Sequence, residues 1–306
     1  MKKMLFTLAM AGLAILLNSG AMAATIYVDQ SGGGTYTKIQ DAINAAAAND
    51  VIMVGPGTYN EAISIDKSVS LIGSGPQYTI IDSKISSLPN ANAVTLNISF
   101  PVIKGFTITS NHSGIIVNTA GVVGMIKNCI ITGCSTGIYA SEKASCDIKI
   151  VNNTIVSNTS NGIYFHNSGA ISVKGNIIAY NGGFGIYSRY TGYSSTYNNL
   201  FENTGGNYAY ISAGVGDTLP DPQFIDPETG NFVLKSSSQC INTGVLDPTF
   251  NDPDGTRNDK GVYGGPDSVS FWPYVVGGPG VTELLITPTS VPKGGKITIK
   301  AKGIVN

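Results

Sequence analysis

Charged residues are scarce in this chain of 306 residues, of which Asp, Glu, Lys and Arg together make up only 12%. The 18 basic and 19 acidic residues nearly cancel, and the formal net charge is −1. Nucleic-acid-binding proteins usually carry a basic excess that neutralises phosphates, so this balance argues against a nucleic acid as partner. Long apolar runs are also missing after Leu17, so no later segment is long enough to cross a bilayer as a helix.

Cysteine is another scarce residue, with only four in the chain: Cys129, Cys134, Cys146 and Cys240. Their small number and irregular spacing fit neither a disulfide framework nor a zinc site. We therefore expect buried thiols at all four positions.

The first 23 residues have the composition of a signal peptide. Lys2 and Lys3 precede an apolar run that ends at Leu17, and the segment from Ala21 to Ala23 reads Ala-Met-Ala. The alternative, a membrane anchor, needs about 20 apolar residues, and this run is shorter. The mature chain is therefore expected to be exported, as a secreted, cell-surface or periplasmic protein.

The stretch from Ile103 to Ile211 repeats nearly the same pattern five times. Successive glycines mark the period: Gly114, Gly137, Gly162 and Gly185 lie 23 to 25 residues apart, and each is followed by an isoleucine. A fixed period of that length indicates a solenoid.

The residues inside each repeat decide the kind of solenoid. Short runs of Ile, Val, Thr and Tyr alternate with Gly, Asn and Ser, which is typical of strands and turns. Stacked coils bury isoleucine on isoleucine and pair each strand with its neighbours, so we predict a parallel β-helix. Asn128, Asn153 and Asn198 recur at the turns and are expected to form an asparagine ladder, interrupted by Gly105 and Gly175.

A short helix is predicted ahead of the first coil. Thr37 can cap it, with Gln40 as the capping-box partner. One face of this helix is apolar and carries Ile39, Ala42, Ile43 and Ala46. We expect that face to cover the open end of the first coil and to block strand pairing with another chain.

These repeats resemble the right-handed β-helix repeats of the pectin-lyase-like superfamily, and residues 26–83 are similar to the N-terminal coil of pectin methylesterases. The resemblance covers roughly residues 25 to 270 and implies an all-β, right-handed parallel β-helix. The QDTL and DFIFG blocks of methylesterases are absent, as are the NTD, DD and GHG blocks of polygalacturonases and the DH and RxPxxR motifs of pectate lyases. The resemblance therefore implies the fold and none of these three activities.

Carboxylates are rare in the repeats. Between Ala93 and Gly216 the only ones are Glu142, Asp147 and Glu202, and Glu202 is more than two coils from the others. Glycoside hydrolysis needs two carboxyl groups across one scissile bond, so a hydrolase is disfavoured.

Tyrosines recur directly after the repeated isoleucines. If each isoleucine points into the core, the next side chain points outward, because strand side chains alternate. This predicts a surface row of Tyr139, Tyr164 and Tyr187, which Tyr208 and Tyr210 extend in the last coil. Such aromatic rings can stack on sugars, or they can merely stack on one another and stabilise the sheet.

Two residues further along, Ser141, His166 and Arg189 are expected to face outward as well. Arginine can bind carboxylates through its planar fork of donors. We interpret the chain as a monomeric polysaccharide-binding protein without catalysis. The alternatives are a polysaccharide lyase that acts on a uronate, with His166 or Arg189 as its base, and a structural or adhesive spacer.

The segment from Asp252 to Gly265 is a loop rich in acidic residues and glycine. Asp252, Asp254 and Asp259 are candidate ligands for calcium, the one cofactor that the sequence suggests. The alternative is a set of Asx-turns around Gly255.

We expect the β-helix and its closing segment to occupy residues 24–275. A glycine- and proline-rich linker follows at 276–281, and residues 282–306 resemble the start of a bacterial immunoglobulin-like domain.

Overall fold

The computed structural model describes residues 23–84, 90–141, 145–166, 169–190, 192–268, 280–287 and 298–304. The predicted signal peptide lies almost entirely outside these ranges. Within them, no helix is long and apolar enough to cross a membrane.

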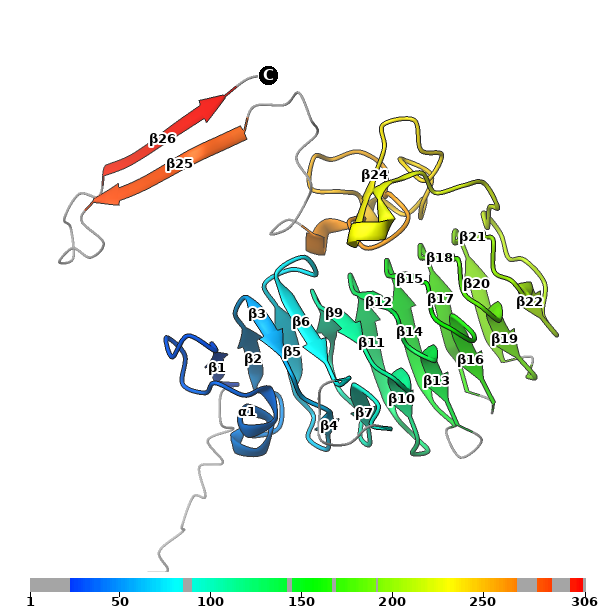
Figure 1. Ribbon diagram of the computed structural model, residues 1–306, viewed down its shortest axis with the longest axis horizontal. Helices are drawn as coiled ribbons and strands as arrows, with labels where there is room; N and C mark the ends of the chain where they lie inside the picture. Colours follow the sequence, from blue (N-terminus) through cyan, green and yellow to red (C-terminus); the bar gives the residue numbers. More distant parts are fainter. Residues whose placement is uncertain are drawn as a thin grey trace, which may run out of the picture.

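The chain winds into a right-handed parallel β-helix, as predicted, and its coils stack side by side in Figure 1. Each full coil contributes one strand to each of three parallel sheets, which we name A, B and C. Sheet A contains β1 (Thr25–Val28), β2 (Val51–Val54), β5 (Ser70–Gly73), β8 (Ile103–Lys104), β11 (Val123–Lys127), β14 (Asp147–Val151), β17 (Ile171–Lys174) and β20 (Tyr193–Thr196). Sheet B contains β3 (Gly57–Tyr59), β6 (Thr79–Asp82), β9 (Thr107–Thr109), β12 (Ile130–Thr132), β15 (Thr154–Val156), β18 (Ile177–Ala179) and β21 (Asn199–Phe201). Sheet C contains β4 (Ile63–Ile65), β7 (Val94–Leu96), β10 (Ser113–Val117), β13 (Thr136–Ala140), β16 (Ile163–Phe165), β19 (Phe184–Ser188) and β22 (Gly206–Ala209).

The core consists of stacked aliphatic side chains, as the period predicts. Ile115, Ile138, Ile163 and Ile186 pair in register on successive strands of sheet C, and each is at most 1% exposed. Parallel strands of this kind bury apolar surface only through their neighbours, so the core extends along the whole axis.

An asparagine ladder runs between sheets A and B, but with a different register from the predicted one. Asn153 donates its side-chain amide to Asn176 at 3.0 Å, and Asn176 donates to Asn198 at 2.9 Å. The prediction of Asn128 as a rung is wrong, because Cys129 occupies that position and donates its main-chain N–H to Asn153. Asn128 instead adopts the left-handed turn conformation (φ 48°), as Asn152 does in the next coil.

A second ladder, which the sequence analysis missed, runs between sheets B and C. Asn158 donates to Asn181 at 2.9 Å, and Asn181 donates to Asn203 at 2.8 Å. All three asparagines are buried. In the coils that contain these asparagines, the two ladders satisfy main-chain groups at both tight turns.

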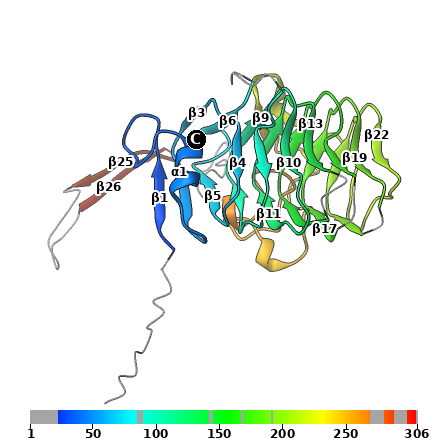
Figure 2. The same ribbon diagram turned by 90° about the horizontal axis from the view of Figure 1, so that it is seen from below.

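Helix α1 (Ile39–Ala45) lies at the N-terminal end of the β-helix, as Figures 1 and 2 show. Its predicted apolar face is buried there. Its N-terminus is capped differently from the prediction. Thr37 and Gln40 form no capping box, and Glu61 accepts the main-chain N–H groups of Ile39 and Gln40 at 2.9 and 3.0 Å. The Gln40 side chain instead bonds to both main-chain groups of Ser64, on the edge strand β4. The helix therefore takes the place of the next strand.

Asp217 closes the opposite end of the first ladder. Its carboxylate accepts the main-chain N–H of Asn198 at 2.8 Å, the Ser195 hydroxyl at 2.6 Å and the Tyr208 hydroxyl at 2.9 Å. Both ends of the β-helix thus carry side chains that supply the missing neighbour's hydrogen bonds.

The segment after the last coil folds back over the outer face of sheet B. It contains β23 (Phe224–Asp226), η1 (Pro227–Thr229), β24 (Asn231–Leu234), η2 (Pro248–Phe250) and η3 (Pro266–Ser268), drawn in yellow and orange in Figure 1. Phe224 and Phe232 of this segment belong to one buried cluster with Ile130 and Ile177 of sheet B. Sheets A and C keep outer faces that can meet a ligand.

Strands β25 (Gly280–Thr287) and β26 (Thr298–Ile304) pair antiparallel with each other. The immunoglobulin-like start and the proposed domain boundaries stay predictions.

Candidate functional site

A row of tyrosines crosses the outer face of sheet C. Tyr139, Tyr164 and Tyr187 pair in register on β13, β16 and β19. Ring centroids are 5.3 Å apart between Tyr139 and Tyr164 and 4.6 Å apart between Tyr164 and Tyr187. The Tyr210 ring, whose residue is 76% exposed, continues the row 5.3 Å from Tyr187. We call Tyr139, Tyr164, Tyr187 and Tyr210 the tyrosine row.

Tyr208 does not belong to this row. It pairs with Ile186, an inward-facing residue, and its ring packs against the end of the core. Its hydroxyl donates to Asp217, and burial followed by the Asp217 charge raises the pKa of Tyr208 far above its usual value. The prediction that Tyr208 faces outward is therefore wrong, because the last coil places this side chain over the core.

His166 and Arg189 lie beside the row, where the alternation places them. The His166 ring is half-buried, with its centroid 5.8 Å from that of Tyr164. The exposed Arg189 donates from Nε to the Tyr187 hydroxyl at 2.9 Å, and this hydrogen bond raises the pKa of Arg189 further. Arg189 is therefore always positively charged and suits the binding of an anion better than the removal of a proton.

The three carboxylates of the repeats do not meet at this row. Asp147 begins β14 of sheet A, Glu202 lies in the turn after β21 of sheet B, and Glu142 is outside the described residues. The described part of sheet C therefore offers no carboxyl pair for glycoside hydrolysis.

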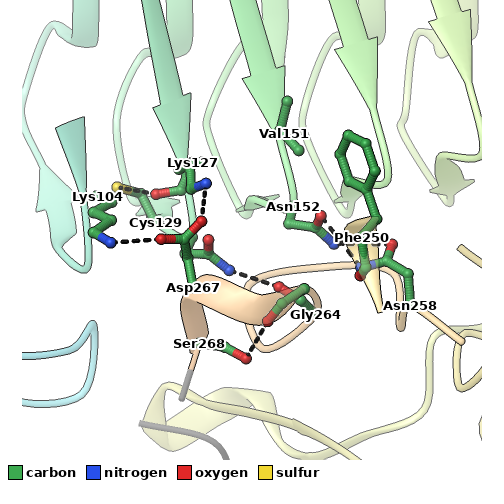
Figure 3. Close-up of polar contacts among 12 residues, drawn as sticks. Lys104, Lys127, Cys129, Val151, Asn152, Phe250, Asn258, Gly264, Asp267 and Ser268 are labelled. Carbon is green, nitrogen blue, oxygen red and sulfur yellow. Dashed lines mark hydrogen bonds and ion pairs between the residues drawn. The ribbon is translucent and has the colours of Figure 1, made fainter. Parts of the chain in front are cut away.

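A second concave surface, on the outer face of sheet A, was not found from the sequence. One side is the sheet itself, and the other is the closing segment around Phe250 and Asp267; the space between them is about 330 Å³. Figure 3 shows the two sides held together by asparagines of the turns. Asn128 donates to the Gly264 carbonyl at 2.8 Å, and Asn152 donates to the Asp259 carbonyl at 2.9 Å. We call this surface the lysine groove.

Lysines from four successive strands of sheet A gather at this groove: Lys104, Lys127, Lys149 and Lys174. Asp267 forms ion pairs with Lys104, at 2.7 Å, and with Lys127, as Figure 3 shows. Burial raises the pKa of Asp267, but the hydrogen bonds from Lys104 and Lys127 more than offset this and lower it overall. The sequence signal for three of them, Lys104, Lys127 and Lys174, was the recurrence of Lys near the end of a strand, as in IKG, IKN and VKG, whereas Lys149 lies in the middle of β14.

The acidic loop is organised by its own main chain. Asp252 is buried and accepts the N–H groups of Asp259 and Gly265 at 2.8 and 2.6 Å. Asp254 accepts the main-chain N–H of Thr256 two residues on, which is an Asx-turn. The described residues contain no group of three or more His, Cys, Asp or Glu side chains placed to hold a metal ion. The hydrogen bonds account for these aspartates without calcium, which stays a prediction.

Asp252 and Asp259 predict an unusual pH dependence of stability. Burial, together with the charge of Asp259, raises the pKa of Asp252 to about 8, and burial raises the pKa of Asp259 to about 6. The folded state therefore holds these protons more tightly than the unfolded state, and their stabilising effect is lost as the pH rises through these values.

We expect the melting temperature to fall between pH 5 and pH 9. The Asp252→Asn variant should show a smaller fall, whereas Asp254→Asn should keep the wild-type slope; equal slopes in all three proteins would contradict this assignment.

All four cysteines are free and buried, as predicted. Burial raises the pKa of Cys129 and Cys134 to about 12 and that of Cys146 and Cys240 to about 11. These thiols are therefore protonated and inert at neutral pH.

Comparison with known proteins gives a family and several partial relatives. A family model described as periplasmic copper-binding protein (NosD) matches residues 21–217. The chain is 32% identical, over 57% of its length, to a cell surface glycoprotein of Methanothermus fervidus, and 25% identical, over 41%, to a probable pectinesterase/pectinesterase inhibitor of Arabidopsis thaliana. The matches span only 30% and 25% of those two proteins.

Similar solved structures include pectate lyase Pel9A and pectin methylesterase from carrot. The first has a TM-score of 0.48 and 14% identity, and the match covers 79% of this chain and 97% of that one. The second has a TM-score of 0.34 and 13% identity, and the match covers 70% and 94% of the two chains.

The description of the matching family names copper, so the question is whether side chains of this chain can hold a copper ion. Copper favours thiolate, thioether and imidazole ligands. The thiols are buried and protonated, and His112 binds Asn92 in a turn while His166 lies on sheet C. Within the described residues, no three His, Cys, Asp or Glu side chains converge as a metal site. The described His, Cys, Asp and Glu side chains therefore do not fit a copper site.

Proposed function

The chain belongs to the NosD family. We propose that it is an exported β-helix protein that binds polysaccharide along the tyrosine row without catalysing a reaction on it. The protein is secreted, to the periplasm or the cell surface. The family is described as periplasmic, and the relative from Methanothermus fervidus is named a cell surface glycoprotein.

The tyrosine row carries this proposal. Four rings follow one another along the axis of the β-helix at centroid separations of 4.6 to 5.3 Å. Tyrosine combines an apolar ring with a hydroxyl, so it can contact the ring face of a sugar and its hydroxyl groups at once. Arg189 adds a fixed positive charge beside Tyr187, which suits a sugar that carries a carboxylate.

The absence of catalysis in this proposal is supported by the charges at the row. Arg189 keeps its proton, and the described strands of sheet C bring no carboxyl pair to it. Elimination from a uronate would create a double bond that absorbs ultraviolet light. Incubation with pectate, alginate and glycosaminoglycans is therefore expected to give no rise in absorbance, and a sustained rise that depends on His166 would replace this proposal with a lyase.

We expect the double variant Tyr164→Ala/Tyr187→Ala to bind glycan more weakly by roughly 1 to 3 kcal/mol, the usual cost of truncating aromatic anchors at a binding surface. A glycan array identifies the ligand, and calorimetry measures the loss. The melting temperature should change little, because partly exposed side chains contribute modestly to stability. The matched control replaces Tyr27 and Tyr78, which are 57% and 53% exposed elsewhere on the surface.

Equal losses in the control and the row variant would remove the row from the binding site. A row variant that unfolds readily, together with a wild-type protein that binds no glycan on the array, would show that the rings only stabilise sheet C. The chain would then be a structural or adhesive spacer.

A further inference from the structure

We propose that the lysine groove is a second binding site, for an anionic polysaccharide whose carboxylate or sulfate groups repeat along the chain. The groove lies on sheet A and is lined by different residues from the tyrosine row on sheet C. This assignment does not depend on the function proposed for the row.

The groove brings together lysines from consecutive strands of sheet A. Lys127, Lys149 and Lys174 line it from the consecutive strands β11, β14 and β17. Neighbouring strands are about 4.8 Å apart, so the outer two lysine backbones are roughly 10 Å apart along the axis. Lys127 and Lys174 share one register row with Val151 between them, whereas Lys149 lies two residues earlier on its strand. Asp267 already pairs with Lys127, so the charges of Lys149 and Lys174 remain for a ligand. Separate positive charges along a groove favour a ligand with repeating negative groups over a single small anion.

The protein's own Asp267 shows what these lysines bind. Its carboxylate lies between Lys104 and Lys127, within 2.7 Å of the Lys104 nitrogen, at one end of the groove (Figure 3). Further along the same sheet, Lys149 and Lys174 form no ion pair with any described carboxylate. Lys149 is also exposed to solvent. Lys104 and Lys127 are register partners, whereas Lys174 pairs with Val151 and not with Lys149. An external ligand that meets both Lys149 and Lys174 therefore has to present a separate carboxylate or sulfate group to each, as an acidic polymer does.

Phe250 supplies an apolar surface at the same place. The Lys174 nitrogen lies 5.4 Å from the centroid of the Phe250 ring, and both residues line the groove. An aromatic ring beside a cation suits a sugar that carries an acidic group, because the ring contacts C–H groups while the cation pairs with the anion. Asp247 partly offsets the charge: hydrogen bonds from Thr249 and, to a smaller extent, the charge of Lys174 lower the pKa of Asp247.

The walls of the groove are preorganised. The Asn258 side chain donates to the Phe250 carbonyl at 3.0 Å, and Asp252 fixes the Gly265 main chain. Gly264 permits the close approach of the two sides, since a Cβ atom there would lie 2.5 Å from the side-chain nitrogen of Asn152, directly after β14. A ligand would therefore not have to order this surface on binding.

The test compares the wild-type protein with the double variant Lys149→Gln/Lys174→Gln. Glutamine keeps most of the side-chain stem and removes the charge. The control variant, Lys38→Gln/Lys235→Gln, loses the same charge from exposed lysines elsewhere. Calorimetry with polygalacturonate, alginate and heparin at several salt concentrations measures binding, and uncharged dextran is the neutral arm. Polygalacturonate and alginate present carboxylates, and heparin adds sulfates, so these arms separate the two sources of charge.

We expect the wild-type protein to bind at least one of the acidic polymers, and to bind it more weakly as salt rises. The groove variant should lose roughly tenfold or more of that affinity at low salt and show a shallower salt dependence, while the control stays close to wild type. If the groove variant and the control lost affinity equally, the loss would come from the lower net charge of the protein and not from the groove, and the proposal would be overturned. The absence of binding to every acidic polymer would also overturn it.

The same experiment separates this proposal from the tyrosine row. If the groove is a site of its own, the Tyr164→Ala/Tyr187→Ala variant retains binding that is lost in the groove variant. If the row variant alone abolishes binding of the acidic polymers, the groove proposal fails and the row is their site.

Discussion

Replacing Asn176 with alanine is expected to destabilise the β-helix by roughly 3 to 5 kcal/mol, because each buried polar group left without its partner costs about 1 to 3 kcal/mol. The Asn176 carboxamide accepts the main-chain N–H of Asn153 at 2.8 Å and its side-chain amide at 3.0 Å. It also donates to the carbonyls of Ile150 and Lys174 at 2.8 and 3.1 Å and to Asn198. Asn176 itself is fully buried. For a domain of this size the melting temperature should fall on the order of 10 °C.

Cys129→Ala is the matched control, because Cys129 occupies the equivalent position of the same ladder in an earlier coil. Its thiol is equally buried and makes only weak hydrogen bonds, with the sulfur 3.3 Å from the Lys127 carbonyl. We expect that variant to lose roughly 1 kcal/mol, mostly from the small cavity. Differential scanning calorimetry of both variants measures the loss of stability. Similar losses for Asn176→Ala and Cys129→Ala would mean that the ladder stabilises the β-helix by packing and not by hydrogen bonding.

The asparagine ladder also shows which features of the fold the sequence predicts and which it does not. The period and the strand-forming residues were sufficient to predict a parallel β-helix, since only stacked coils bury the repeated isoleucines. The register at the turns was harder, because Asn appears there for two different reasons. Asn128 and Asn152 take the left-handed conformation, while Asn153 and Asn176 accept hydrogen bonds inside the turn. Adjacent asparagines with different roles cannot be separated by residue type alone.

The tyrosine row was predictable, whereas the lysine groove was not, for a physical reason. The row depends on one local rule, the alternation of side chains on strands that share a register. The groove needs a second wall, and Phe250 and Asp267 come from a segment more than 100 residues after Lys127 and Lys149. Their meeting depends on how that segment folds back over the turns, which no local pattern indicates.

Tyr208 marks the limit of the alternation rule. Its ring packs at the end of the core, because Tyr208 pairs with Ile186 and so occupies the inward position that isoleucine holds in the earlier coils. End coils of a solenoid face solvent on one side and depart from the repeat for that reason.

The N-terminal end of the solenoid carries the second large prediction: Ala42→Asp should detach helix α1 and cause aggregation. Ala42 is completely buried against the first coil, so the substitution places an unpaired carboxylate in the core at a cost of roughly 3 to 5 kcal/mol. Once the helix detaches, the main chain at Ser64 on β4 loses its hydrogen bonds to Gln40. An exposed edge strand of this kind pairs readily with another chain.

Ala45→Asp provides the matched control, since Ala45 lies on the same helix and is exposed. A carboxylate near the C-terminus of a helix costs at most about 1 kcal/mol through the helix dipole. We expect this variant to remain monomeric in size-exclusion chromatography with light scattering, and the Ala42→Asp variant to form soluble aggregates or precipitate at the same concentration. A monomeric Ala42→Asp protein with an unchanged melting temperature would show that the β-helix does not need the helix as its cap. Opposite behaviour of the two substitutions, three residues apart, would instead show that the buried face of α1 protects the edge of sheet C.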